Sequence, residues 1–343
     1  MKRHVNIPIF IPHLGCPNQC VFCNQRSITG KADFDPETVD SLIREALSTI
    51  PDGTETEIAF FGGSFTGIDY TLMCRLLEIA YSYVKTGKVS SIRCSTRPDY
   101  INEKILDTLN SYGVRVIELG LQSTDDEVLR LTKRGHSFEE ERIAVRMIKE
   151  RGFSLIGQMM IGLPGSTPEK EIATARFICD SGADGARVYP TVVFRDTELC
   201  RMAEDGTYAP LSLDDAVSRT AEVLKIFESN EVKVIRVGLC ASENLSSPEA
   251  YYAGPNHSAL GELCENRVFY SLIHKKLIEI SPPKDAKITV KVPRGAISKA
   301  IGQKKNNKLR LIFEFSLSDI FFEEDDSLTG YEIKCEERKN KCT

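Results

Sequence analysis

Three cysteines near the N-terminus constrain this chain more than any other feature. Cys16, Cys20 and Cys23 lie in the stretch P-H-L-G-C-P-N-Q-C-V-F-C, directly after an apolar run that ends at Ile11. Thiolates are soft ligands for zinc and for iron–sulfur clusters. Three of them on one short loop can hold three irons of a cubane cluster and leave the fourth iron open for chemistry. His13 could instead complete a zinc site with them, so the spacing alone leaves both metals open.

The chain length and composition describe an ordinary globular protein. The 343 residues fit one large domain and a smaller one, with 41% apolar and 27% charged residues. The N-terminal apolar run is too short for a signal peptide, and no stretch reaches the roughly 20 apolar residues of a membrane span. Eleven cysteines without a paired framework predict reduced thiols and a cytoplasmic location. The net charge of −5 gives no overall indication of nucleic-acid binding.

Short β-rich runs alternate with helical patterns along most of the chain. The six runs cover residues 5–12, 57–63, 91–97, 115–123, 154–162 and 186–193, and a further strand-like stretch covers 232–239. Because parallel neighbours need a crossover element, the alternation predicts a parallel α/β sheet. Six strand–helix units favour a partial (β/α)6 TIM-like barrel, while periodicity alone does not exclude a doubly wound open sheet. Sites in both folds gather at the carboxyl ends of the strands.

The cysteine spacing C-x3-C-x2-C, with Phe22 before the last cysteine, resembles the motif of the radical SAM superfamily. The resemblance implies that Cys16, Cys20 and Cys23 hold a [4Fe-4S] cluster whose open iron binds S-adenosylmethionine, with Phe22 at the cofactor site. It further implies reductive cleavage of S-adenosylmethionine to methionine and a 5′-deoxyadenosyl radical. An electron donor such as flavodoxin or ferredoxin is then expected as a partner.

Two adjacent glycines end the second predicted strand, in the sequence F-F-G-G-S-F-T-G. Gly62 and Gly63 would let the backbone approach a ligand closely, and a simple β-turn is the alternative. In the radical SAM family the matching G-G-E stretch binds the methionine amino group of S-adenosylmethionine through its backbone. The resemblance therefore implies cofactor binding by Gly62, Gly63 and Ser64. The G-G-S sequence, with serine at the third position, resembles the variant of this stretch in the Elongator-like branch of the family.

The fourth and fifth predicted strands supply the remaining expected cofactor contacts. Alternation places Glu118 and Gln122 on one face of the fourth strand, where a carboxylate is costly unless it is paired or meets a ligand hydroxyl. The resemblance implies that this strand contacts the ribose of S-adenosylmethionine. It also implies that Gly157, Gln158 and Met160 of the fifth strand lie beside the adenine, although a methionine here could equally fill the core.

Basic residues follow the third and fourth predicted strands. Arg97 could face the site or be held at the surface by Asp99. The sequence K-R-G-H, from Lys133 to His136, is similar to a stretch of the family that touches substrate. A solvated basic turn is the interpretation that we favour for it.

Three residues further along are candidates for contact with substrate. Tyr189 and Arg195 lie in R-V-Y-P-T-V-V-F-R-D-T, which resembles the same region of the Elongator-like branch. His257 lies in G-P-N-H-S-A-L-G-E-L, and a hydrogen-bonded structural histidine is the alternative there. We assign Tyr189, Arg195 and His257 as candidate catalytic residues. Elongator-type enzymes alkylate the wobble uridine of tRNA and carry an acetyltransferase domain, and we expect the acetyl-donor chemistry not to carry over to this chain.

The composition becomes basic after residue 283. Residues 284–310 contain nine lysines or arginines and one acid. Their strand–helix–G-x-x-x–helix–strand pattern resembles the KH module, whose G-x-x-G loop clamps single-stranded nucleic acid. The resemblance implies RNA contacts from Gly302, Lys304, Lys305 and Lys308, with Lys305 in place of the second glycine. A solvated lysine face on a small packing domain is the alternative.

These observations divide the chain into a radical SAM core at 1–240, a barrel-closing or connecting segment at 241–283, and a small basic KH-like α+β domain at 284–343. The leading hypothesis is a radical SAM enzyme that acts on RNA, with tRNA as the first candidate. The alternatives are a radical SAM enzyme on a small-molecule, tetrapyrrole or peptide substrate, and a cluster-carrying RNA-binding protein without turnover.

Overall fold

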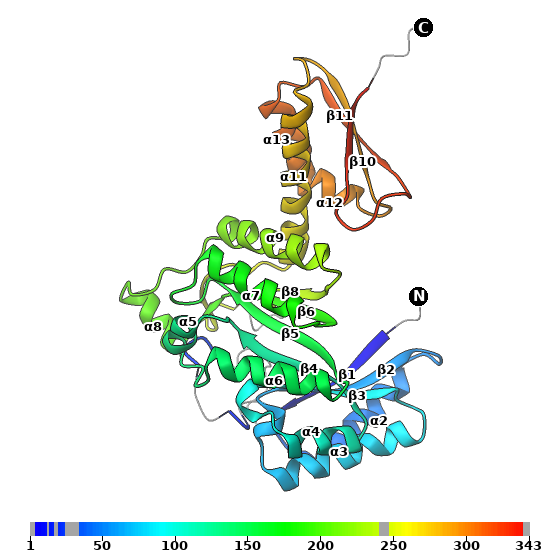
Figure 1. The fold of residues 1–343 in the computed structure, drawn as a ribbon, viewed down its shortest axis with the longest axis vertical. Helices are drawn as coiled ribbons and strands as arrows, with labels where there is room; N and C mark the ends of the chain where they lie inside the picture. Colours follow the sequence, from blue (N-terminus) through cyan, green and yellow to red (C-terminus); the bar gives the residue numbers. More distant parts are fainter. Residues whose placement is uncertain (1–3, 12–13, 17–19, 25–33, 240–246, 339–343) are drawn as a thin grey trace.

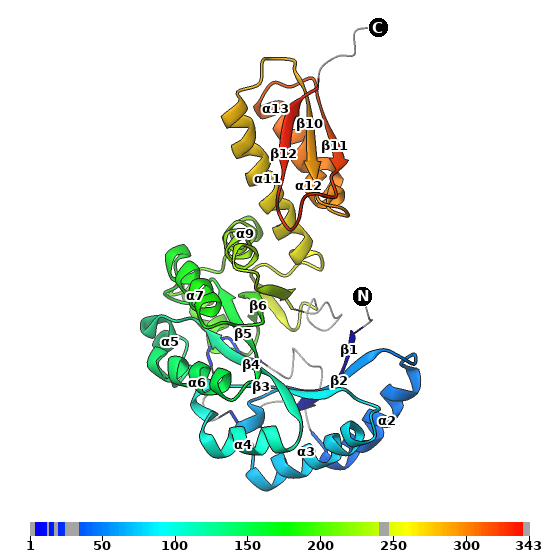
Figure 2. The same cartoon turned by 45° about the vertical axis from the view of Figure 1, so that its right-hand side comes forward.

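One curved parallel sheet forms the larger part of the molecule. The computed structural model describes residues 4–11, 14–16, 20–24, 34–239 and 247–338. The sheet has the strand order β1-β2-β3-β4-β5-β6-β8, with every neighbouring pair parallel. The strands are β1 (His4–Ile11), β2 (Glu55–Gly62), β3 (Ser91–Thr96), β4 (Val114–Gln122), β5 (Ser154–Ile161), β6 (Gly185–Pro190) and β8 (Lys233–Val237). Figure 2 shows that the sheet curls into a half-barrel.

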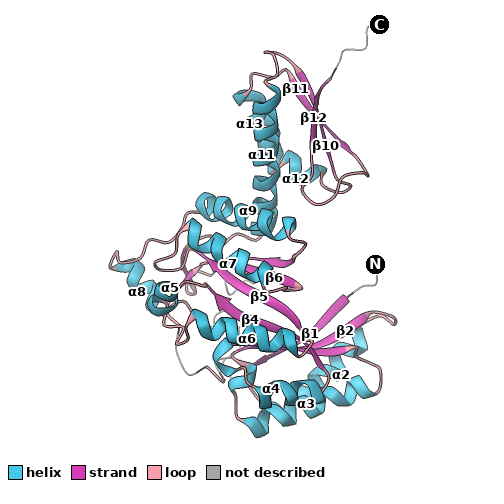
Figure 3. Ribbon diagram, viewed as in Figure 1, coloured by secondary structure: helices cyan, strands magenta, loops and turns pink. Residues whose placement is uncertain are grey.

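Helices cover the convex side of this sheet (Figures 1 and 3). The helices of the half-barrel are α2 (Val39–Thr49), α3 (Tyr70–Lys85), α4 (Glu103–Ser111), α5 (Asp126–Leu131), α6 (Phe138–Glu150), α7 (Pro168–Asp180), α8 (Glu198–Glu204) and α9 (Leu213–Ser229). Local signals in the sequence set several helix starts. The Thr167 hydroxyl accepts a hydrogen bond from the Lys170 amide at the start of α7, and Ser137 with Glu140 forms a capping box on α6.

The sheet order decides between the two folds that periodicity left open. A doubly wound sheet reverses its strand order near the middle, whereas these strands follow the order of the sequence. All six predicted strands are present, and the strand-like stretch at 232–239 provides the seventh, β8. The partial TIM-like barrel is therefore confirmed, with one strand more than the six units predicted.

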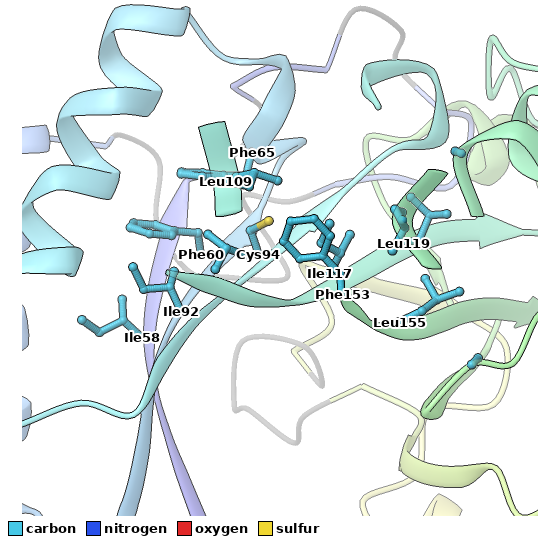
Figure 4. Close-up of a cluster of buried hydrophobic side chains, with 14 of the residues drawn as sticks. Ile58, Phe60, Phe65, Ile92, Cys94, Leu109, Ile117, Leu119, Phe153 and Leu155 are labelled. Atoms are coloured by element: carbon cyan, nitrogen blue, oxygen red, sulfur yellow. The ribbon is translucent and has the colours of Figure 1, made fainter. Parts of the chain in front are cut away.

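The main hydrophobic core lies between the sheet and the convex layer of helices. Figure 4 shows Phe60 of β2 beside Phe65, and their rings stack with centroids 4.4 Å apart. Ile117 of β4 and Ile92 of β3 point into the same layer and are fully buried. Side chains alternate along a strand. The residues directly before and after Ile92 and Ile117 on their own strands therefore face the concave side. The concave side is where the candidate site lies.

A smaller α+β module follows the half-barrel. It contains β10 (Lys287–Val292), α12 (Ile297–Ile301), the 3-10 turn η4 (Gln303–Lys305), α13 (Asn306–Glu314), β11 (Asp319–Glu324) and β12 (Lys334–Glu337). Its strand order is β11-β10-β12, and the helices pack on one face of that sheet (Figure 2). The strand–helix–helix–strand order that the sequence predicted is present.

The long helix α11 (Leu260–Ile280) belongs to both parts of the molecule. Its first half packs on α9, with Cys264 and Val268 buried in that contact. Its second half supplies Phe269 and Ile273 to the core of the α+β module. The division of the chain at residue 283 stays a prediction, because one continuous helix joins the two cores.

None of the helices in the described ranges is long and apolar enough to cross a membrane.

We predict that Phe60→Ala lowers the free energy of unfolding by about 3–5 kcal/mol, because the ring is fully buried and its loss leaves a cavity. Urea unfolding followed by circular dichroism measures the change. Ile143→Ala is the matched control, since Ile143 on α6 is 39% exposed and should change stability by less than about 0.5 kcal/mol. Equal effects of the two substitutions would contradict the assigned core.

Candidate functional site

The cysteine loop lies at the carboxyl end of β1. Cys20 is buried, whereas Cys16 and Cys23 are half-buried, and the Cys23 amide donates to the Cys20 carbonyl at 3.0 Å. Burial raises the pKa of the Cys16 thiol, and a hydrogen bond from the Ser64 backbone opposes that shift. His13, the possible zinc ligand, lies outside the described residues. The loop thus presents three thiols at the end of the sheet where sites gather.

Backbone hydrogen bonds attach this loop to two distant segments. The Val21 amide donates to the Thr132 carbonyl at 3.2 Å, and the Leu199 amide donates to the Val21 carbonyl at 2.8 Å. The Val21 side chain is buried in a small cluster that includes Val193 and Leu199, and Phe22 packs against this cluster. The loop is therefore held by residues after β4 and by the start of α8.

Two buried arginines surround the Cys20 sulfur. The Arg134 Nη1 donates to Cys20 Sγ at 3.3 Å, and the Arg97 Nη1 lies 4.0 Å from the same sulfur. A second Arg134 nitrogen donates to the Gly120 carbonyl at 2.6 Å. The two guanidinium groups thus place positive charge and hydrogen-bond donors beside this sulfur. This corner of the site therefore suits an anionic sulfur.

The structure corrects the interpretation of K-R-G-H as a solvated turn. Arg134 and His136 are only 5% and 7% exposed, whereas Lys133 reaches solvent, where it pairs with Glu198 at 2.6 Å. Burial is the main reason that the pKa of His136 falls to about 3. No local pattern distinguishes a buried basic turn from an exposed one. The contact with Cys20, more than a hundred residues earlier in the chain, is what decides its burial.

Arg97 faces the site, and the expected pairing with Asp99 is present, but Arg97 is not at the surface. Its guanidinium makes two hydrogen bonds of 2.9 Å to Asp99 and also donates to the Arg134 carbonyl. It nevertheless is only 4% exposed and faces Cys20. Asp99 thus holds Arg97 in place within the site and not at the surface.

The glycines after β2 bring this segment against the cysteine loop. The Gly63 amide donates to the Ile11 carbonyl at 2.8 Å, and a Cβ on Gly63 would lie 2.1 Å from the Leu14 carbonyl oxygen. A Cβ on Gly15 would similarly lie 2.1 Å from the Ser64 carbonyl oxygen. Gly62 has a φ of 109°, which favours glycine. The close backbone approach expected here is therefore present, and its partner in the structure is the loop itself.

Gln122 ends β4 in a strained conformation. Its φ is 71°, its side chain is 5% exposed, and its Oε1 has no hydrogen-bond partner within the described part of the chain. A left-handed backbone at a residue other than glycine costs energy and is concentrated at functional sites. An unsatisfied buried acceptor at the carboxyl end of a strand is a candidate ligand contact.

Glu118 lies in a row of alternating charges on the concave face. Its carboxylate meets Arg93 at 3.0 Å and Arg187 at 2.8 Å, and it is 2% exposed. Arg93 also binds Glu57, which in turn lies 2.8 Å from His4. Burial alone would raise the pKa of Glu57, but hydrogen bonds from Ser91 and Arg93 hold it below its usual value. Arg93 and Arg187 therefore pair with the buried Glu118 from two sides.

The fifth strand separates the expected adenine contacts between its two faces. A Cβ on Gly157 would lie 2.7 Å from the Ile178 side chain of α7, so this residue packs against the convex layer. Gln158 and Met160 alternate with it, face the concave side and are half-buried. Met159 is fully buried in the core.

The three candidate substrate residues occupy different environments. Tyr189 is half-buried on β6, where its hydroxyl lies 3.5 Å from Arg187 and burial raises its pKa. Arg195 is exposed and donates to the Pro248 carbonyl at 2.9 Å. The exposed His257 accepts a hydrogen bond from the Ala259 amide at 3.1 Å, just before α11 begins. Both Arg195 and His257 thus have identifiable local structural partners.

The loop between α12 and α13 has an unusual backbone. Gly302, Lys304 and Lys305 have φ values of 78°, 51° and 62°. Lys305 stands where the KH pattern has a second glycine, and it adopts a conformation that glycine would adopt more easily. Lys308 is engaged in an ion pair with Asp319 at 2.8 Å.

Comparison with known families places the site in context. A model of the radical SAM superfamily matches residues 10–178, and a model of the radical SAM C-terminal domain matches residues 183–269. The chain belongs to the radical SAM superfamily. Membership implies a [4Fe-4S] cluster and S-adenosylmethionine as cofactors.

The relatives of this radical SAM chain point to the Elongator-like branch. It is 26% identical over 240 residues to the tRNA uridine(34) acetyltransferase of Dehalococcoides mccartyi, which covers 60% of this chain and 52% of the relative. It is 32% identical over 151 residues to human Elongator complex protein 3, covering 43% of this chain and 28% of the relative. The chain spans at most about half the length of these curated relatives.

A solved structure supports the radical SAM fold. An archaeal Elp3 from Methanocaldococcus infernus, lacking its N-terminus, superimposes with a TM-score of 0.62 at 24% identity. The match covers 80% of this chain and 64% of that one.

The residues of this radical SAM chain fit the implied cluster by their chemistry. Within the described ranges, no three His, Cys, Asp or Glu side chains lie close enough together to hold a metal ion. The fit therefore rests on the three thiols of the loop and on the two guanidinium groups beside Cys20. Thiolates are the ordinary ligands of [4Fe-4S] clusters.

We predict that Glu118→Gln lowers the free energy of unfolding by about 3 kcal/mol or more, because it leaves two buried arginines facing a neutral amide. Urea unfolding of the apoprotein measures this loss. Glu139→Gln is the control, since the Glu139–Arg142 pair is exposed and should contribute less than about 1 kcal/mol. A loss at Glu118 no larger than at Glu139 would show that the concave row does not stabilise the fold.

Proposed function

We propose that this chain is a radical SAM enzyme that acts on RNA, with tRNA as the first candidate substrate. One observation carries the proposal. In a C-x3-C-x2-C loop at the carboxyl end of a half-barrel, the guanidinium groups of Arg97 and Arg134 lie beside the Cys20 sulfur. When bound, the cluster would supply the electron that cleaves S-adenosylmethionine to methionine and a 5′-deoxyadenosyl radical. Flavodoxin or ferredoxin remains the expected donor of that electron.

Cys16, Cys20 and Cys23 would hold the cluster as thiolates. Arg134 and Arg97 would stabilise the anionic sulfur of Cys20, since each places a guanidinium nitrogen within 4.0 Å of it. The packing of Val21 and Phe22 against the segment around Leu199 would keep the loop in one conformation. Hydrogen bonds to cluster sulfurs also tune reduction potential, so these arginines belong to the proposed machinery.

S-adenosylmethionine would lie on the concave face at the ends of β2, β4 and β5. The backbone at Gly62, Gly63 and Ser64 is placed beside the cysteine loop, where the methionine part would bind. The unsatisfied Oε1 of Gln122 offers an acceptor that a ligand donor could meet.

The adenine is proposed to contact Gln158 and Met160, which are half-buried on the concave side of β5. Gly157 would take part through its backbone alone, since it packs against Ile178 on the other side. Glu118 would act through Arg187 and not directly on the ribose, because two arginines already occupy its carboxylate.

Substrate is proposed to enter from the open side of the half-barrel. Tyr189 is placed on the concave face beside Arg187, which makes it the strongest of the three candidates for contact with substrate. Arg195 and His257 remain candidates on exposed segments, where their local hydrogen bonds give each a structural role as well.

RNA as the substrate rests on two supports. Curated relatives carry the name tRNA uridine(34) acetyltransferase, although the chain spans only about half of their length. The α+β module carries Lys304 and Lys305 on an exposed loop beside Gly302, where their ammonium groups could contact phosphates. Lys308 would contribute less, because Asp319 already pairs with it.

We predict that anaerobically reconstituted wild type forms 5′-deoxyadenosine from S-adenosylmethionine and reductant, and that bulk tRNA increases the yield. Cys20→Ala should abolish product, because the loop then lacks a thiolate ligand. Cys74→Ala on α3 is the control, since this half-buried cysteine lies outside the loop and should leave the yield unchanged. Chromatography of the quenched reaction measures the nucleoside.

The outcomes separate the hypotheses. Product that does not respond to tRNA would keep the radical enzyme and move the substrate to a small molecule, tetrapyrrole or peptide. Tight RNA binding and a cluster without product would favour a binding protein without turnover. Absence of both cluster absorbance and product would contradict the proposed function.

We also predict that Lys304→Glu combined with Lys305→Glu weakens RNA binding about tenfold or more and lowers the salt dependence of the affinity. Lys275→Glu combined with Lys284→Glu makes the same charge change at exposed positions outside the loop and should have a smaller effect. Fluorescence anisotropy with labelled tRNA at several salt concentrations measures both. Equal weakening by the two pairs would show that only net charge matters.

A further inference from the structure

The outer face of α13 carries two exposed apolar side chains, and the lysine loop directly precedes this helix. Leu309 is 58% exposed and Phe313 is 86% exposed, the highest value among the large hydrophobic side chains that the structure describes. Residues four apart are neighbours on a helix surface, so Leu309 and Phe313 form one apolar stripe on α13, and Lys304 and Lys305 lie just before the first turn of this helix. At 1.5 Å per residue, Leu309 and Phe313 are about 6 Å apart along the helix axis.

The exposure of Phe313 follows from how α13 packs. The opposite side of this helix contributes Leu311, which is fully buried in the core of the module. The Asn307 side chain donates to the Asn266 carbonyl at 2.8 Å and to the Ala300 carbonyl at 3.1 Å. These contacts with α11 and α12 fix the rotation of α13. The aromatic ring is therefore presented to solvent by a well-anchored helix.

The lysines of the loop before α13 differ from the other cations nearby, because no carboxylate in the described part of the chain pairs with them. The neighbouring Lys299, Lys308 and Arg310 each pair with a carboxylate at 2.7–2.8 Å. By contrast, the exposed Lys304 and Lys305 have no ion pair among the residues that the structure describes. Both also hold left-handed backbone conformations, a strain that is concentrated at functional sites.

We propose that Lys304, Lys305, Leu309 and Phe313 form a strip that binds single-stranded RNA, with the lysines on phosphates and one base stacked on Phe313. This inference rests on the proposed function and specifies how the module would hold the RNA. An exposed aromatic ring near the end of α13 and unpaired lysines before its start are the combination that unstacked bases and a phosphate backbone require.

Charge complementarity selects RNA over other occupants. Two apolar side chains give too little area for a stable interface between proteins, which buries about 800 Å² on each partner. The base must be unpaired, because a duplex keeps its aromatic faces inside the stack. An RNA loop or single-stranded end is therefore the expected ligand.

The natural absence of tryptophan provides a direct test. Phe313→Trp places the sole indole of the protein at the proposed stacking position. Saturation of the full chain with an oligouridine RNA should quench its fluorescence, with an affinity within about twofold of wild type. Ile143→Trp on α6 is the matched control, since Ile143 is 39% exposed and lines the same surface hollow as Arg142 and Arg146. Its fluorescence should not change.

Two further substitutions measure separately how much Phe313 and Lys305 contribute to RNA binding. Phe313→Ala should weaken oligouridine binding about ten- to hundredfold, the range found when a stacked base loses its aromatic partner. The melting temperature should not fall, because the ring contributes little to the core. Lys305→Gly should also weaken binding, while relieving the left-handed strain and leaving stability equal or higher.

The possible results distinguish this strip from RNA binding in general. If Phe313→Ala binds normally while Lys304→Glu with Lys305→Glu binds weakly, RNA binding stands and the strip is wrong. If wild type binds neither oligouridine nor tRNA, the proposed RNA function fails together with it. If Phe313→Ala instead turns a dimer into a monomer in sedimentation, the stripe is a contact between copies and the inference is overturned.

Discussion

The candidate site depends on a row of alternating, paired charges across the concave face of the half-barrel. A parallel sheet is normally apolar on both faces, because helices bury both. Here helices cover the convex face, and Glu57, Arg93, Glu118 and Arg187 form a paired row on the concave face. Each buried charge has an opposite partner, so no charge of the row is desolvated alone. A polar concave face can then accept a charged, hydrogen-bonding ligand without unfolding the sheet.

The cysteine loop depends on this frame from both sides. Gly63 lets the segment after β2 lie directly against the loop, where any side chain would meet the Leu14 carbonyl. Arg134 reaches Cys20 from the segment after β4 and is held by the Gly120 carbonyl. The sheet therefore places backbone on one side of the loop and positive charge on the other. The guanidinium groups would offset the negative charge of the thiolates that an iron–sulfur cluster requires.

Periodic patterns in the sequence predicted the helices and strands well. They did not predict the contacts between segments that are distant in the sequence. Strand alternation was sufficient for the half-barrel, and Pro168 with its cap was sufficient for α7. The burial of Arg134 depends on a partner in another part of the chain, so K-R-G-H looked like a surface turn. Gly157 shows a similar limit, because only the packing of Ile178 reveals which face it occupies. The exposed ring of Phe313 likewise follows from the rotation of α13, which local sequence does not set.

The most direct test of the account is electron paramagnetic resonance of the reconstituted protein, reduced under anaerobic conditions, with and without S-adenosylmethionine. We expect the signal of a reduced [4Fe-4S] cluster, and we expect S-adenosylmethionine to shift this signal by binding at the open iron. A cluster signal that S-adenosylmethionine leaves unchanged would contradict the proposed binding site. A protein that binds zinc and shows no cluster signal would contradict the central claim itself.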